Sequence, residues 1–193
     1  WKAGTFKNLQ AHSTLEMKPI PGMMGAEDIT IDQATGLALV SSYNRRKVIK
    51  GEASKGAIYL LDYLASPPKI TDLTANFDQP DFHPHGISLY KDPVDSTQWL
   101  FVVNHRDKGH FIEIFQFTGS ALIHSESVSS GHFFSPNDVV GVGKRQFYFT
   151  NDHDEKGGIS NFKDFLLIGT GQVGYFDGKK TEILDRGIRY ANG

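Results

Sequence analysis

A polar pair of residues followed by a short apolar strand recurs along this chain at nearly constant intervals. The pairs are Glu27-Asp28, His85-Gly86, Asn137-Asp138 and Asn192-Gly193. Their spacings are 58, 52 and 55 residues, counted from 27 to 85, from 85 to 137 and from 137 to 192. A fixed period of several tens of residues is typical of repeat architectures, either solenoids or propellers. The repeat therefore limits the chain to a fold built from similar units.

Each repeat contains four strand-like segments. The first begins at the polar pair and covers residues 29–32 in the first repeat. Short β-rich runs bounded by turn residues then predict second strands at 37–41, 99–104 and 147–150, third strands at 57–62, 111–117 and 172–176, and fourth strands at 70–73, 121–124 and 181–184. No window of a dozen residues keeps the spacing of an amphipathic helix. Four antiparallel strands per unit predict an all-β chain of propeller blades.

The length of the chain sets how much of a propeller it can form. Propellers typically close with about four to eight blades, whereas 193 residues hold only about three and a half units of this period. We therefore expect residues 1–193 to form a single incomplete propeller domain, the N-terminal portion of a longer chain. Because the sequence starts at Trp1, we also expect that a targeting segment was removed or that the natural N-terminus is missing. Membrane anchoring through such a missing segment stays open.

The amino-acid composition excludes several classes of partner, cofactor and catalytic mechanism. A formal net charge of -2 and the lack of a long basic run argue against a nucleic-acid partner. The chain has no cysteine, which excludes disulfides, zinc fingers, iron–sulfur clusters and thiol catalysis. Any bound metal must therefore be held by oxygen atoms or imidazole. Motifs of serine hydrolases, nucleotide hydrolases and Rossmann enzymes are also missing from the sequence, which argues against these classes.

In a propeller blade, the start of the innermost strand and the end of the second strand lie on one face, at the mouth of the central channel. The repeat therefore brings together carboxylates and amides from distant strand starts, namely Glu27, Asp28, Asn137, Asp138 and Asn192. Such hard oxygen ligands suit Ca²⁺ better than zinc or copper. Taken singly, each pair could be an ordinary turn former. Their recurrence at one blade position favours a calcium site.

Histidines of the second repeat reach the same face, because His85 opens its first strand and His105 closes its second. A neutral imidazole there could activate water, with the other ring relaying the proton. A pair of purely structural histidines is the alternative. Asp152 and His153, at the end of the next second strand, could supply a supporting acid–base pair. The short basic cluster Arg45-Arg46-Lys47 indicates a solvated loop, which could touch substrate if it lies near the channel mouth.

Six segments spread over most of the chain form a specific series. They are Gly-Ala-Glu-Asp-Ile-Thr-Ile at 25–31, Pro-His-Gly-Ile-Ser at 84–88, Val-Val-Asn-His at 102–105, Asn-Asp-Val-Val at 137–140, Phe-Tyr-Phe-Thr-Asn-Asp-His at 147–153 and Ala-Asn-Gly at 191–193. In this order they resemble the paraoxonase (serum paraoxonase/arylesterase) family, which is related more distantly to gluconolactonase-like propellers. The lack of cysteine is more similar to microbial members of that family.

The resemblance implies a fold, a metal content and an activity. It implies a six-bladed propeller with two calcium ions in its central tunnel. It also implies hydrolysis of lactones, with additional cleavage of aryl esters. The family's remaining calcium ligands, an Asp-Asn pair from a later blade, have no counterpart within residues 1–193.

The resemblance also assigns residues by position. Glu27, Asn137 and Asn192 resemble ligands of the catalytic calcium. Asp28, Asp138 and the backbone carbonyl of Ile87 resemble ligands of a buried structural calcium. His85 and His105 match the family's histidine dyad. The substrate pocket is then expected to include Tyr190, which matches an aromatic lining residue, together with Asp152 and His153.

The leading hypothesis is a calcium-dependent hydrolase of small-molecule lactones and aryl esters. In it the metal stabilises the developing oxyanion, His85 deprotonates the attacking water and His105 orients that water. The alternatives are a non-catalytic, calcium-stabilised propeller that binds a ligand or protein, and a gluconolactonase-like sugar lactonase with a single metal. The paired Glu27-Asp28 and Asn137-Asp138 favour two metals. Calcium sites of moderate affinity are filled most readily where the calcium concentration is millimolar. We therefore expect an extracellular, periplasmic or membrane-anchored protein.

Overall fold

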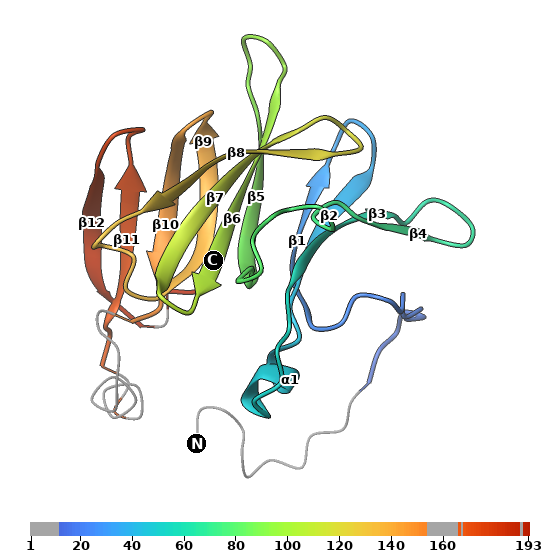
Figure 1. Ribbon diagram of the computed structural model, residues 1–193, viewed down its shortest axis with the longest axis horizontal. Helices are drawn as coiled ribbons and strands as arrows, with labels where there is room; N and C mark the ends of the chain where they lie inside the picture. The colour runs from blue at the N-terminus through green and yellow to red at the C-terminus, as the bar shows by residue number, and fades with distance from the viewer. Residues whose placement is uncertain (1–11, 154–165, 167, 190) are drawn as a thin grey trace.

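Each repeat folds into its own four-stranded antiparallel sheet, in which the strands pair in chain order. The structure is a computed structural model and describes residues 12–153, 166, 168–189 and 191–193. Its three sheets are arranged one after another as blades of a partial β-propeller (Figure 1). The predicted all-β propeller architecture is thereby confirmed.

The strands follow the predicted units closely. The first sheet consists of β1 (Ala26–Asp32), β2 (Leu37–Ser42), β3 (Ala57–Asp62) and β4 (Lys69–Asp72). The second consists of β5 (Pro84–Lys91), β6 (Gln98–Arg106), β7 (Gly109–Phe117) and β8 (Leu122–Ser129). The third consists of β9 (Pro136–Gly143), β10 (Gln146–Asn151), β11 (Gly171–Phe176) and β12 (Thr181–Ile188).

One short helix, α1 (Arg45–Ile49), interrupts the first blade between β2 and β3. Asn44 precedes it, and its side-chain Oδ1 accepts a hydrogen bond from the backbone N–H of Lys47 at 3.1 Å. This is the usual way in which an asparagine caps a helix start. The helix carries the basic cluster predicted to be a loop, and it therefore gives that cluster a fixed place in the fold.

The middle sheet is buried on both faces because its strand β6 alternates between two hydrophobic cores. Leu100 and Val102 pack with Leu39 and Ile58 of the first sheet. Phe101 and Val103 pack in a second core, to which the third sheet contributes Val139, Phe147, Phe149 and Phe176 and the β8–β9 connection contributes Phe133. Successive residues of a strand point to opposite faces. The nearly continuous apolar run of β6 is therefore what a strand covered on both sides requires.

The innermost strands β1, β5 and β9 lie next to one another, with β5 in the middle. Between β5 and β9, the Gly141 N–H donates a hydrogen bond to Ser88 Oγ at 3.2 Å. On the first and third sheets, by contrast, some large apolar side chains are uncovered, among them Ile29 and Val140, which are 54% and 52% exposed. No helix in the described part of the chain is both long enough and apolar enough to cross a bilayer.

Candidate functional site

The starts of the three inner strands meet, as the repeat predicts. Asp28, in β1, reaches across to β5, where its Oδ2 accepts a hydrogen bond from the Ile87 N–H at 2.7 Å. Its other oxygen, Oδ1, accepts from the Ile29 N–H at 2.7 Å. The carboxylate is therefore held between two strands whose residues lie 59 positions apart in the sequence.

Asp138, in β9, approaches the same place from the other side of β5. A Cβ atom added to Gly86 would lie 2.5 Å from Asp138 Oδ1 and 2.5 Å from the Asn137 carbonyl oxygen, so only glycine leaves room here. A Cβ at Gly193 would lie 3.5 Å from Asp138 Oδ2, so the last repeat's polar pair also arrives at this point. Asn192 itself is exposed, and its role as a ligand stays a prediction.

The carboxylates of these strand starts oppose one another electrostatically. Burial raises the pKa of Glu27; the charge of Arg45 counteracts this, and the charges of Asp28 and Asp138 add to it. Burial also raises the pKa of Asp138, the Val139 N–H lowers it, and the charge of Asp28 raises it. Partly buried carboxylates that repel each other are stabilised by a cation. This donor set of hard oxygens fits a calcium ion.

His85 stands beside these oxygens and is 7% exposed. Its Nδ1 lies 3.0 Å from the carbonyl oxygen of Asn137 and 3.1 Å from Glu27 Oε2. Because a carbonyl only accepts, Nδ1 carries the proton and donates it, which leaves the lone pair of the neutral ring on Nε2. Burial lowers the pKa of His85, and the charge of Arg45 lowers it further. Both effects favour the neutral form of the ring.

His105 meets His85 edge-on, with ring centroids 5.1 Å apart and planes 88° apart. The predicted dyad is thus brought together. A third histidine joins them: His110, on β7, pairs directly with His105 across the hairpin, and their Nδ1 atoms are 2.8 Å apart. Sequence reasoning missed His110. The two-residue turn that joins Arg106 to Gly109 would have placed it opposite His105.

The segment before β5 is held to the end of β6 by its own contacts. His83 donates through Nδ1 to the His105 carbonyl oxygen at 2.7 Å, and its ring stacks on Tyr43 with centroids 4.3 Å apart. Asp81 Oδ2 accepts from the Asp107 N–H at 2.8 Å. Potential ligand atoms of Asp81, His83 and Asp107 lie within 4.8 Å of one another. His83 Nδ1 and Asp81 Oδ2 are both engaged in hydrogen bonds that tie the segment before β5 to the end of β6.

Two of the remaining predicted pocket residues are described. Asp152 follows β10 and donates its backbone N–H to the Ser135 carbonyl oxygen at 3.1 Å. The charge of Asp152 raises the pKa of His85, but burial and Arg45 lower that pKa by more. His153 Nε2 lies 3.8 Å from Asp152 Oδ2. Both follow the end of the third blade's second strand, as predicted, and their place in a substrate pocket stays a prediction. Tyr190 lies outside the described residues.

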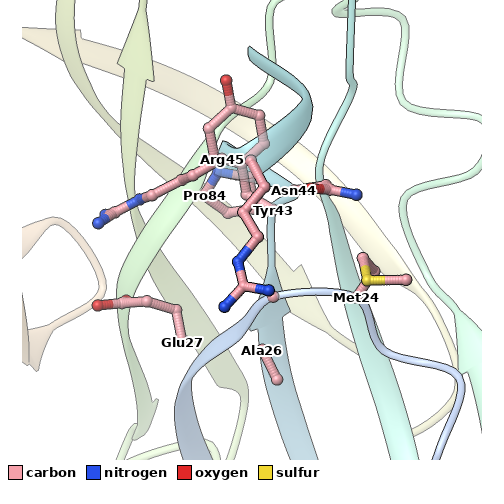
Figure 2. A pocket seen from close by; sticks show the side chains of 9 residues that line it. Met24, Ala26, Glu27, Tyr43, Asn44, Arg45 and Pro84 are labelled. Atoms are coloured by element: carbon pink, nitrogen blue, oxygen red, sulfur yellow. The ribbon is translucent and has the colours of Figure 1, made fainter. Parts of the chain in front are cut away.

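A cavity of about 410 Å³ opens beside Glu27 (Figure 2). Its lining comes from the chain entering β1, from the segment that runs from the end of β2 into α1, and from Pro84 of β5. The lining consists of Met24, Gly25, Ala26, Glu27, Tyr43, Asn44, Arg45, Arg46 and Pro84. The cavity therefore joins a predicted calcium ligand to the basic cluster.

Comparison with known proteins agrees with this architecture. The family described as Arylesterase matches residues 11–193. The chain is 37% identical over 176 residues to serum paraoxonase/arylesterase 2 of Gallus gallus, a match that covers 88% of this chain and 49% of that protein. It is 32% identical over 179 residues to serum paraoxonase/arylesterase 1 and 31% identical over 176 residues to serum paraoxonase/lactonase 3, both of Homo sapiens, with the same coverage. The chain spans about half the length of these relatives. The resemblance inferred from the six segments is confirmed, and the chain belongs to the arylesterase family.

Proposed function

We propose that this chain supplies the metal-binding and catalytic face of a calcium-dependent hydrolase that acts on lactones and aryl esters. The observation that carries the proposal is the convergence of three carboxylates and a buried neutral histidine from three different blades. The printed names of the relatives, which include arylesterase and lactonase, support the same class of reaction.

Two calcium ions fit the two sets of oxygens. Glu27 and Asn137, together with Asn192, would hold the catalytic ion. Asp28 and Asp138, together with the carbonyl of Ile87, would hold the structural ion. Calcium, when bound, supplies Lewis-acid stabilisation of negative charge that develops on the substrate's carbonyl oxygen. The mutual repulsion of Glu27, Asp28 and Asp138 is the structural feature that makes these positions suitable for cations.

The remaining steps fall to the histidines. His85 is anchored through its Nδ1–H to Asn137, so its Nε2 is the atom that takes a proton from the attacking water. Its lowered pKa keeps it unprotonated and ready for that task. His105, which lies edge-on to that ring, would orient the water, and its Nδ1 pairs with the Nδ1 of His110. Removing a general base typically costs about 100- to 10,000-fold in rate.

The test uses the intact protein with aliphatic lactones and an aryl acetate, in calcium and after exhaustive chelation. We expect turnover that chelation abolishes and added calcium restores. We also expect His85→Gln to lose about 100-fold or more in kcat while it still binds calcium by calorimetry. Turnover that survives complete metal removal would overturn the calcium role.

The same experiments separate the other functions. Calcium-dependent thermal stabilisation without turnover of any ester or lactone would identify a binding module. One calcium per chain, with a preference for polyhydroxylated lactones, would identify a sugar lactonase. We favour two ions because carboxylates from both β1 and β9 are paired with a second oxygen donor next to them in the sequence, as in Glu27-Asp28 and Asn137-Asp138. An extracellular or membrane-anchored location, where calcium is millimolar, fits such sites.

A further inference from the structure

The cavity beside Glu27 is lined by a guanidinium that has no carboxylate partner among the residues that the structure describes. Arg45, the first residue of α1, lines the cavity with Glu27, Tyr43 and Pro84 (Figure 2). Among residues 12–153, 166, 168–189 and 191–193, no carboxylate oxygen lies within 4.0 Å of its side-chain nitrogens. A charged group that faces a cavity without an ion pair is a candidate ligand contact.

The charge of Arg45 lowers the pKa of both Glu27 and His85. After burial, which acts in the opposite direction, it is the strongest influence on the pKa of Glu27, and after burial it is also the strongest influence on the pKa of His85. Arg45 and Glu27 also line the same cavity, so a substrate bound beside Glu27 would lie next to Arg45. Lys47, two residues further along the same helix, does not line this cavity and offers a comparison within the same element.

The cavity walls also suit a particular kind of molecule. Met24, Pro84 and the ring of Tyr43 provide apolar surface for a hydrocarbon ring, while Arg45 and Arg46 provide two positive charges against the single negative charge of Glu27. An excess of positive charge in a cavity attracts anions. The guanidinium fork matches a carboxylate with two parallel hydrogen bonds, which an uncharged lactone or ester cannot offer.

We propose that Arg45 binds an anionic group, a carboxylate, carried by the substrate, so that the preferred substrates are lactones or esters with an acidic substituent. This inference rests on the hydrolytic function proposed above and specifies its substrate class. The reacting carbonyl lies toward Glu27 and His85, and the acidic substituent lies toward α1. Hydrolysis itself is unchanged, because the carboxylate serves only to bind and orient the substrate.

The test compares two lactones that differ in one group: a γ-lactone with a carboxylate on its side chain, and the primary amide of the same acid. Ring opening is followed at saturating calcium in the intact protein, in Arg45→Met and in the control Lys47→Met. We expect the wild-type protein to favour the carboxylate by about tenfold or more in kcat/KM, because charge-assisted hydrogen bonds contribute about 1.5–3 kcal/mol and 1.4 kcal/mol corresponds to a tenfold change. Arg45→Met should reduce the ratio of the two kcat/KM values to near one.

The Lys47→Met variant shows whether the preference depends on Arg45 or on any positive charge of α1. Lys47→Met removes an equal charge from the same helix but should leave the ratio close to the wild-type value. Equal losses in both variants would assign the preference to the general basic surface and overturn the role of Arg45. A wild-type protein without preference for the carboxylate would overturn it as well.

A second measurement separates this inference from the proposed hydrolysis. If neither lactone is opened, the proposed function fails, but calorimetric binding of the same two lactones still tests Arg45. Tighter binding of the carboxylate than of the amide, lost in Arg45→Met and kept in Lys47→Met, supports the inference without any turnover. Equal binding of the two lactones by the wild-type protein contradicts it.

Discussion

Glu113 is fully buried in the middle blade, and replacing it should be among the most destabilising changes in the molecule. Its carboxylate accepts hydrogen bonds from Asn104 Nδ2 at 2.8 Å, from Arg106 Nη2 at 2.5 Å and from the Ser127 hydroxyl, and His124 Nε2 lies 3.1 Å away. The exposed fractions of the Glu113 and Arg106 side chains are 0% and 16%. Glu113→Leu would therefore leave a largely buried guanidinium and the buried amide of Asn104 without their acceptor.

Breaking a buried ion pair by removing one partner typically costs about 3–5 kcal/mol in the free energy of unfolding. We expect that range for Glu113→Leu in urea-induced unfolding of the intact protein at saturating calcium. The control is Glu126→Leu, on β8 of the same sheet, which removes the exposed pair with Arg145 at 3.0 Å. Exposed pairs contribute at most about 1 kcal/mol. A loss at Glu113 no larger than the loss at Glu126 would refute the assignment of a stabilising buried network.

The remaining predictions concern the site and the blades around it. Asp138→Asn should weaken calcium binding by about tenfold or more in calorimetry, yet raise the thermal stability of the chelated protein, because it removes one of the opposed carboxylates; lower stability in chelator would contradict this. Gly86→Ala should weaken calcium binding and lower stability by about 1–3 kcal/mol, since its Cβ would lie 2.5 Å from Asp138 Oδ1. His110→Asn, whose amide can take the place of Nδ1, should keep kcat within about threefold, whereas His110→Gln should lose about tenfold; the reverse order would remove the positioning role. Burial alone would raise the pKa of Asp32, but hydrogen bonds from the Ala34 N–H and the Thr35 hydroxyl hold it below its usual value. A lowered folded-state pKa contributes stability above the unfolded pKa that is lost as pH falls, so the stability difference between wild type and Asp32→Asn should shrink from pH 6 to about pH 2, as measured by urea unfolding.

Much of the fold could be predicted because the repeat gives the number of strands in each blade and the apolar runs mark where most strands lie. The predicted strands 57–62 and 172–176 match β3 and β11 closely. The outermost strands of the second and third sheets were predicted too short: 121–124 against β8 (Leu122–Ser129), and 181–184 against β12 (Thr181–Ile188). These strands are mostly solvent-facing, so backbone pairing to β7 and β11, rather than an apolar pattern, determines where they end. Helix α1 has only five residues, too few for a helical period to show.

Only those site residues whose positions follow from the blade topology could be predicted from the sequence. Asp28 and Asp138 meet because every blade starts its inner strand at the same face. His110 could not be found from that rule, since its position depends on the hairpin register between β6 and β7. Arg45 depends on helix α1 between β2 and β3, where the second blade has only a two-residue turn between β6 and β7. The positions of residues in the connections between repeated strands therefore cannot be predicted from the repeat alone. His110 and Arg45, which distinguish this site, are placed by such connections.

Strand β6 shows how the core and the site are joined in one element. Its residues Leu100 to Val103 are each 0% exposed and pack on both neighbouring sheets. The next residue, Asn104, is also fully buried; its Nδ2 donates to Glu113 and its Oδ1 accepts from the His83 N–H at 2.8 Å. His105 follows directly. The proposed catalytic histidine is thus one residue away from a side chain that is fixed by the core, and groups carried by rigid elements keep the geometry that a site requires. Loss of Glu113 should for this reason reduce kcat even where the protein remains folded.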